Sequence, residues 1–401
     1  MRTIQSLATA LSLLAGALIT LVPAGATTGA ASSLECATRV VAAWPIARQA
    51  AETIVVPVDA MHLGAMVPAA RAGYGGLILF GASGSPVMAS TLRALQRMTP
   101  APYPMLVMTD EEGGGVRRLE NLVVPFPWPQ DMGRTMSPSR IATVGATVGA
   151  QLESLGVNTD LAPVADLDAR QVWPGATNPD GLRSFGAAPL KAALDVAAFA
   201  RGLGSSGVVA VVKHFPGLGG STSNTDYGPA ATKPWSVLET GALLPFERAI
   251  AAGAPVVMLS NATVPGLSTL PAGLSAPVVA ALRGQLGFQG MIMTDSLSAG
   301  AIGALGLSVP TAAVRALAAG ADQVLFGGST SPAGALALAQ SVSSAIQRAV
   351  AQGTLGATTL TSAAARVLVV QALAAHVTLA CPAPTTPAGT SNTTTTATSQ
   401  G

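Results

Sequence analysis

Residues 208–217, VVAVVKHFPG, carry the pattern that decides the fold of this chain. The apolar, β-branched run Val208–Lys213 ends at a charged residue, Lys213. The titratable His214 and a Pro216-Gly217 turn follow it. Continuous apolar runs of this length are typical of parallel strands that are buried on both faces. The same pattern recurs in Thr53–Val58, Gly76–Phe80, Met105–Thr109, Asn158–Ala162, Val256–Ser260, Met291–Thr294 and Gln323–Phe326.

The segments between these runs have apolar residues at helical spacing, and many of them end at a glycine. Strand–helix alternation repeated about eight times predicts an α/β fold, a single-domain (β/α)8 barrel of the TIM type. A doubly wound open sheet is the alternative, and the count of strands disfavours it. The predicted helices are Pro86–Arg97, Ser137–Leu155, Leu190–Leu203, Trp235–Ala252, Ala276–Leu286 and Val309–Ala319.

The composition provides a large core and excludes one class of partner. Of the 401 residues, 49% are apolar and only 10% are charged. The net charge of +2 comes from 21 basic and 19 acidic residues that are spread without runs. Because no basic stripe or aromatic-interleaved basic cluster is present, we expect no nucleic-acid partner.

The two ends of the chain differ in composition from its body. Arg2, the apolar run Leu7–Val22 and the small residues 24–26 are typical of an export signal. We expect residues 1–26 to be a signal peptide, 27–36 a short linker, 37–380 the barrel, and 381–401 a disordered Thr/Ser/Pro-rich tail. The mature protein is then secreted or extracytoplasmic, without a membrane span. Lipid attachment at Cys36 is a minor alternative, which Glu35 disfavours because such sites need a small residue there.

The chain has two cysteines, Cys36 and Cys381, one near each end of the predicted barrel. In an oxidising compartment we expect them to form a disulfide that closes a very long loop. Two free thiols are the alternative.

Polar or glycine-rich groups follow six of the predicted strands directly. In a (β/α)8 barrel the carboxyl ends of all strands lie on one face, where active sites are built. Ionisable side chains gathered at strand ends in a chain with so little charge therefore predict a site on this face. These groups are 110–114, 163–166, 213–217, Asn261, Asp295-Ser296 and 327–328.

Five motifs carry a resemblance to a known family. Residues 110–119 (DEEGGGVRRL), 161–166 (LAPVAD), 183–186 (RSFG), 213–217 (KHFPG) and 294–298 (TDSLS) occur in this order. They are similar to the segments DQEGGRVQRL, LAPVADV, RSFG, KHFPG and (T/S)D(S/D)LSM of the bacterial β-N-acetylglucosaminidases of glycoside hydrolase family 3. The five motifs are distributed across nearly the whole predicted barrel.

The resemblance implies roles for individual residues. Asp295 corresponds to the catalytic nucleophile of a two-step retaining mechanism. Its alternative reading is the N-cap of a helix that starts at residue 297. Asp110, Arg183, Lys213 and His214 correspond to positions that bind the sugar hydroxyls. For Arg183 a structural ion pair with Asp166 is the alternative.

The family's acid/base segment is where this chain departs from the pattern. The family has HGDTxVDSH after KHFPG, and its Asp-x-His pair supplies the acid/base. This chain has Leu218, Asn224 and Asp226 where the family has the first His, the Asp and the last His. Three readings stay open: Asp226 is the acid/base, Glu111 or Glu112 replaces it, or the barrel binds carbohydrate without efficient turnover.

The sequence therefore predicts a secreted, exo-acting, retaining glycosidase for terminal β-linked sugars. By the resemblance the substrate is a β-N-acetylglucosaminide from cell-wall or peptidoglycan fragments, and a catalytically weak or inactive carbohydrate-binding barrel is the alternative. No His/Cys ligand spacing and no P-loop are present, so we expect no metal and no cofactor. We expect a monomer.

Overall fold

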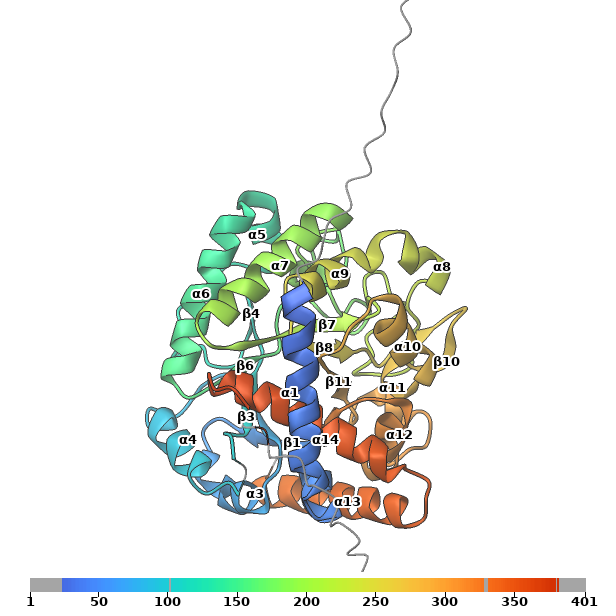
Figure 1. Ribbon diagram of the computed structural model, residues 1–401. Coiled ribbons are helices and arrows are strands. Elements are labelled where there is room, and N and C mark those ends of the chain that lie inside the picture. The colour runs from blue at the N-terminus through green and yellow to red at the C-terminus, as the bar shows by residue number, and fades with distance from the viewer. Residues whose placement is uncertain (1–23, 101, 328–330, 380, 382–401) are drawn as a thin grey trace, which may run out of the picture.

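The computed structural model describes residues 24–100, 102–327, 331–379 and 381. Eight parallel strands close into a barrel in the order β1-β12-β11-β8-β7-β6-β3-β2 (Figure 1). Each predicted run overlaps one of these strands, so the barrel is confirmed and the open sheet is excluded. The strands are β1 Ile54–Asp59, β2 Gly76–Phe80, β3 Leu106–Thr109, β6 Thr159–Asp160, β7 Val209–Phe215, β8 Val256–Leu259, β11 Met291–Ser296 and β12 Gln323–Leu325.

Strand alternation explains how the site residues reach the interior of the barrel. In β7, Val209 and Val211 belong to the apolar cluster inside the barrel, whereas Ala210 and Val212 belong to the cluster under the helices. Successive side chains of a strand point to opposite faces, so Lys213 continues the inward set. By the same alternation, Asp110 follows the inward-facing residues Leu106 and Met108 of β3. Asp295 likewise continues the inward-facing residues of β11.

Helices cover the outside of the barrel and bury their apolar stripes against it. Several begin with a proline, whose fixed φ suits the first helical turn. Ser137 also caps α6, since its hydroxyl accepts a hydrogen bond from the N–H of Arg140. The helices of this layer are α2 Ile46–Glu52, α3 Val67–Ala72, α4 Met88–Gln96, α5 Pro129–Thr135, α6 Pro138–Ser154, α7 Pro189–Ser205, α8 Trp235–Val237, α9 Leu244–Ala251, α10 Ala276–Ala280, α11 Gly300–Gly303, α12 Val309–Ala319 and α13 Pro332–Ala351.

The last helix, α14 (Ala357–Ala374), closes the amino-terminal end of the barrel. Val367, Val370 and Ala374 join the cluster of side chains inside it. Among the described residues α14 is the one helix long and apolar enough to cross a membrane, and 50% of that stretch is buried inside the protein. The apolar composition of α14 is therefore explained by its role as a core helix of the barrel.

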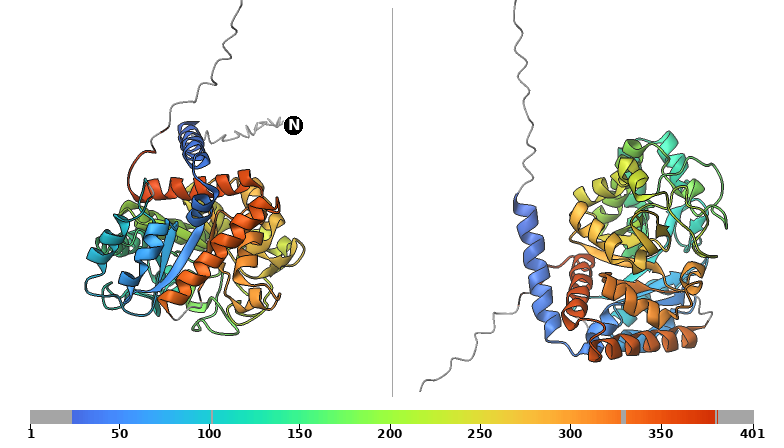
Figure 2. Two further views of the ribbon diagram at one scale, coloured as in Figure 1. Left: turned by 90° about the horizontal axis from the view of Figure 1, so that it is seen from below. Right: turned by 90° about the vertical axis from the view of Figure 1, so that its right-hand side faces the viewer.

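The chain begins its described part with helix α1 (Ala24–Ala42), which lies against α14 (Figures 1 and 2). Ala37 and Val41 pack in one cluster with Leu368. The predicted disulfide between Cys36 and Cys381 is present and joins α1 to the segment after α14.

The expected linker over residues 27–36 is wrong, because these residues belong to α1. Ala-rich sequence allows a helix, and the packing of its second half on α14 stabilises it, which composition alone does not reveal. Residues 1–23 of the predicted signal peptide and 382–401 of the predicted tail lie outside the described residues.

Candidate active site

All six predicted site residues line one cavity of about 270 Å³ at the carboxyl ends of the barrel strands. The inner apolar residues Ile78, Leu161, Met258 and Leu325 also line it and belong to the packed barrel interior, so they form its floor. The cavity is thus closed at its inner end. The six residues are Asp110, Arg183, Lys213, His214, Asp226 and Asp295.

Four charged side chains form a continuous array on one side of this cavity. The Lys213 ammonium contacts Asp110 Oδ1 at 2.7 Å and Glu112 Oε1 at 2.6 Å. Arg183 donates from Nε and Nη2 to the two oxygens of Glu112, both at 2.7 Å. Burial opposes ionisation of Glu112, but Arg183 and Lys213 outweigh it and hold its pKa far below the ordinary value. Each sugar-binding candidate is therefore fixed in place by an oppositely charged neighbour.

This geometry excludes Glu112 as the acid/base and gives Arg183 its partner. A carboxylate held ionised between two cations has no proton to donate. The ion pair of Arg183 is with Glu112, while the carboxylate of Asp166 binds His214 instead. Glu112 is a member of the charged array that the sequence did not show, since its partners Arg183 and Lys213 lie far along the chain.

Glu111 supports the loop and does not reach the cavity. Its Oε1 accepts from the backbone N–H of Arg118 at 2.8 Å and of Leu119 at 2.6 Å, which holds the hairpin of β4 (Glu111–Gly113) and β5 (Val116–Arg117). Burial raises the pKa of Glu111 to about 7. The side chain is fully buried and is absent from the cavity lining, so it does not meet a substrate there.

Asp295 lies near the end of β11 and faces the cavity. The Ser296 N–H donates to Asp295 Oδ1 at 2.6 Å. Burial raises the pKa of Asp295, and the neighbouring His214 opposes this rise. The next helix, α11, begins at Gly300 after Ala299, so Asp295 is not its N-cap.

His214 is anchored from behind by Asp166. Its Nδ1 lies 2.7 Å from Asp166 Oδ2, and the N–H of Leu218 donates to Asp166 Oδ1 at 2.7 Å. Burial lowers the pKa of His214 to about 4, and nearby Arg183 adds to this. The imidazole is thus neutral at pH 7 and presents a hydrogen-bonding ring to the cavity.

Asp226 is exposed on the loop over the cavity, and backbone hydrogen bonds tie that loop to the start of α11, the helix that follows the strand of Asp295. The N–H of Gly300 donates to the Asp226 carbonyl at 3.0 Å. Asn224 Oδ1 accepts from the Asp226 N–H at 2.9 Å, and Asn224 Nδ2 donates to the Gly175 carbonyl at 3.1 Å. Asn224 therefore shapes the loop through its amide and does not form a carboxylate–imidazole pair.

Two exposed aromatic rings border the same cavity. Tyr227 lines it with 72% of its surface exposed, and Trp173, next to the lining residue Pro174, is 67% exposed. Trp173 meets Trp128 edge to face, with ring centroids 4.9 Å apart. Exposed aromatic residues beside a polar cavity are a feature that the sequence analysis missed, because isolated aromatics in loops have no periodic signal.

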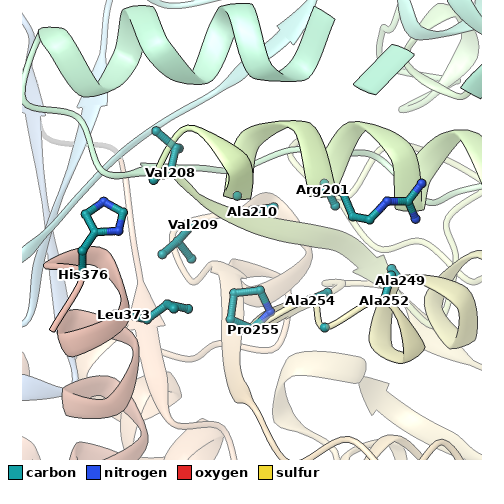
Figure 3. Close-up of a pocket in the computed structure, with 14 residues that line it drawn as sticks. Arg201, Val208, Val209, Ala210, Ala249, Ala252, Ala254, Pro255, Leu373 and His376 are labelled. Carbon is teal, nitrogen blue, oxygen red and sulfur yellow. The ribbon is translucent and has the colours of Figure 1, made fainter. Parts of the chain in front are cut away.

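A second cavity, of about 300 Å³, lies at the opposite end of β7. Figure 3 shows Val208, Val209, Pro255, Leu373 and His376 around it. Its described lining contains no carboxylate and is mostly apolar, so the residues of glycosidic chemistry are gathered in the first cavity.

Comparison with protein families matches residues 67–370 to the glycosyl hydrolase family 3 N terminal domain. The chain belongs to glycosyl hydrolase family 3. This agrees with the resemblance carried by its five motifs.

Relatives in this family have related names. Beta-hexosaminidase LpqI of Mycobacterium tuberculosis is 36% identical over 234 residues, which cover 55% of this chain and 58% of LpqI. An uncharacterized secreted glycosyl hydrolase of Arthroderma benhamiae is 34% identical over 243 residues, or 58% of this chain and 67% of that protein. The crystal structure of a β-N-acetylhexosaminidase from Beutenbergia cavernae is similar with a TM-score of 0.72 and 31% identity, covering 82% of this chain and 98% of that one.

Proposed function

We propose that this family 3 barrel is an exo-acting, retaining glycosidase that removes a terminal β-linked N-acetylhexosamine. The observation that carries the proposal is that Asp295 and Asp226 line one cavity, closed at its inner end, together with the array of Asp110, Arg183 and Lys213. The names of LpqI and of the Beutenbergia cavernae enzyme support the same sugar class.

Asp295 has the surroundings of a nucleophile. A retaining enzyme needs a carboxylate that attacks the anomeric carbon and forms a covalent glycosyl-enzyme intermediate. The N–H of Ser296 stabilises one Asp295 oxygen, which leaves Oδ2 for attack. Burial raises the pKa of Asp295, which makes its carboxylate more basic and so more reactive toward carbon. The positive charge of Lys213 opposes this rise and favours the ionised form that attacks.

Asp226 is the acid/base in this proposal. Its carboxyl group protonates the leaving oxygen in the first step and removes a proton from water in the second. It lies in the cavity lining on a loop separate from the charged array, which supports a leaving group on that side of the cavity.

The closed floor of the cavity supports exo action. Since the packed barrel interior ends this cavity of about 270 Å³, a chain cannot pass through it, and binding of one terminal sugar is favoured. The charged array lies beside this terminal sugar, where carboxylates, Lys213 and Arg183 bind hydroxyl groups.

The exposed rings of Trp173 and Tyr227 offer stacking surfaces for the leaving group. Tyr227 follows Asp226 directly, so it borders the side on which the acid must act. Sugar rings present C–H groups to aromatic faces, and such surfaces bind without adding charge. A carbohydrate leaving group from a cell-wall fragment fits this arrangement.

The disulfide and the secreted relative fit an extracytoplasmic location. Cell-wall fragments are available there, which supports the choice of substrate source.

One assay tests the proposal. The purified protein is incubated with an aryl β-N-acetylglucosaminide beside Asp295→Ala and Asp226→Ala variants. We expect turnover by the parent with retained anomeric configuration, no turnover by Asp295→Ala, and covalent labelling of Asp295 by a mechanism-based fluorosugar. Sugar binding without turnover by the parent would instead favour the carbohydrate-binding barrel. Activity that survives in Asp295→Ala contradicts the proposed nucleophile.

A further inference from the structure

A group of buried ionisable side chains lies behind His214, outside the contacts assigned above to substrate. Asp166 is 1% exposed and Asp180 is fully buried. A ligand atom of each, together with one ring nitrogen of His214, lies within 4.8 Å of the others. The three residues come from separate segments, because Asp166 follows β6, Asp180 precedes the turn Gly181–Arg183 and His214 is in β7.

Asp166 has the environment of a carboxylate. Its Oδ1 accepts from the N–H of Leu218 at 2.7 Å and of His214 at 3.2 Å. Its Oδ2 lies 2.7 Å from His214 Nδ1. Backbone N–H groups are donors only, so the set of contacts favours an ionised Asp166 that accepts from Nδ1–H.

Asp180 has the opposite environment. Both of its carboxyl oxygens are buried, and no N–H or O–H group of the described residues donates to either of them in place of water. An ionised carboxylate without donors is costly inside a protein, whereas a protonated one has an O–H that needs a single acceptor. Burial raises the pKa of Asp180 well above its ordinary value, and the charge of Asp166 adds to this effect.

We propose that Asp166 and Asp180 share one proton, which Asp180 holds, and that this pair fixes His214 as the Nδ1–H tautomer with Nε2 facing the cavity as an acceptor. Asp180 is then a positioning residue that acts through Asp166 and His214. His214 in this state accepts a hydrogen bond from a sugar hydroxyl, while Lys213 and Arg183 donate to others. The site thereby presents both donors and acceptors to the sugar.

The charged groups around the histidine agree with this protonation state. Burial and the charges of Arg183 and Lys213 disfavour an imidazolium and outweigh the charge of Asp295, so the pKa of His214 is lowered to about 4. Burial raises the pKa of Asp166 to about 6. The hydrogen bond from Asp180 and the charge of Arg183 lower this pKa but do not cancel the effect of burial. The Asp180 proton therefore keeps Asp166 ionised at neutral pH.

Nitrogen-15 NMR of the parent tests the tautomer without any substitution. The chain holds three histidines, His62, His214 and His376, so the imidazole spectrum is simple to assign. At pH 7 we expect His214 to show a protonated Nδ1 and an unprotonated Nε2. A protonated Nε2 on His214 at this pH overturns the proposal.

A matched pair of variants tests the role of Asp180. In Asp180→Asn the amide N–H replaces the O–H and donates to Asp166, so we expect the parent tautomer and a kcat/KM within about 3-fold of the parent, since one donor is exchanged for another. In Asp180→Leu the donor from residue 180 is lost and only backbone N–H groups still donate to Asp166. Asp166 then takes up a proton itself and donates it to Nδ1. We then expect the Nε2–H tautomer to become the major form and activity to fall about 10–100-fold, as large as the loss when the group that orients a metal-ligating histidine is removed.

An unchanged His214 spectrum in a folded Asp180→Leu variant contradicts the proposal. So does a spectrum of the parent that changes on addition of EDTA, because it would show a metal ion held by the three groups instead of a proton. The activity arm rests on the proposed glycosidase function, but the NMR arm does not depend on turnover. Failure of one is therefore distinguishable from failure of the other.

Discussion

At the scale of single residues, the substitution of the family's acid/base histidine by Asp226 has a direct kinetic consequence. We expect Asp226→Ala to slow cleavage of a disaccharide about 10²–10⁴-fold, the usual contribution of general acid catalysis. An aryl glycoside with a nitrophenyl leaving group needs less protonation, so its first step should be slowed far less. When Asp226→Ala acts on this aryl glycoside, added azide should restore turnover and give a glycosyl azide of retained configuration. Equal losses for both substrates and no azide rescue would argue against Asp226.

Glu112 is the residue on which two cations depend. In Glu112→Gln, Lys213 keeps Asp110 as its partner but Arg183 loses its ion pair. We expect KM for the glycoside to rise and the free energy of unfolding to fall by about 3–5 kcal/mol, as for other buried pairs that lose one partner. Denaturant unfolding and steady-state kinetics measure both effects. Glu120→Gln, at an exposed position, serves as the control.

The stability of the fold should depend on pH through Glu111. Its folded pKa of about 7 exceeds its ordinary value of 4.5, so between these values the folded state binds a proton that the unfolded state has lost. The contribution of this group is therefore full below pH 4.5 and decreases as the pH rises to about 7, by up to about 1.4 kcal/mol per unit. Glu111→Gln mimics the protonated form and should unfold with a weaker pH dependence in this window. The free energy of unfolding is measured by urea titration at several pH values. If it changes with pH as steeply in Glu111→Gln as in the parent, the assignment is contradicted.

At the scale of elements, two loops at the barrel mouth place the exposed rings. The loop of Trp173 and the loop of Tyr227 are joined by the hydrogen bond from Asn224 to Gly175. We expect Trp173→Ala and Tyr227→Ala to raise KM for a disaccharide by about 5–10-fold, which corresponds to about 1 kcal/mol for one lost ring contact. KM for a methyl glycoside should hardly change, because its leaving group is too small to stack. Val172→Ala, an exposed neighbour, is the matched control.

At the scale of the whole molecule, the disulfide fastens α1 across α14. The bond joins residues 345 positions apart. We expect Cys36→Ser with Cys381→Ser to destabilise the protein by about 2–4 kcal/mol, the common range for a native disulfide. Because α1 lies outside the barrel, proteolysis within α1 should speed up first, while activity is retained. Thermal unfolding and limited proteolysis with and without reductant measure this, and simultaneous loss of activity would show that α1 supports the site.

The sequence by itself determined the barrel, its eight strands and the six predicted residues of the cavity, but not the places of Glu112, Trp173 and Tyr227 beside it. These features are local, since an apolar run followed by a polar strand end is written in consecutive residues and each motif fits within about ten. Strand parity then carries Asp110, Lys213 and Asp295 inward once the strands are placed.

Only the tertiary structure decided how these residues are paired. Lys213 and Asp110 are 103 residues apart, Arg183 and Glu112 are 71 apart, and His214 and Asp166 are 48 apart. Which carboxylate meets which cation depends on distances set by barrel closure, and so do the burial and the protonation state of each group. The helix α1 follows the same rule, because its packing on α14 comes from the far end of the chain and its own composition gave no sign of it.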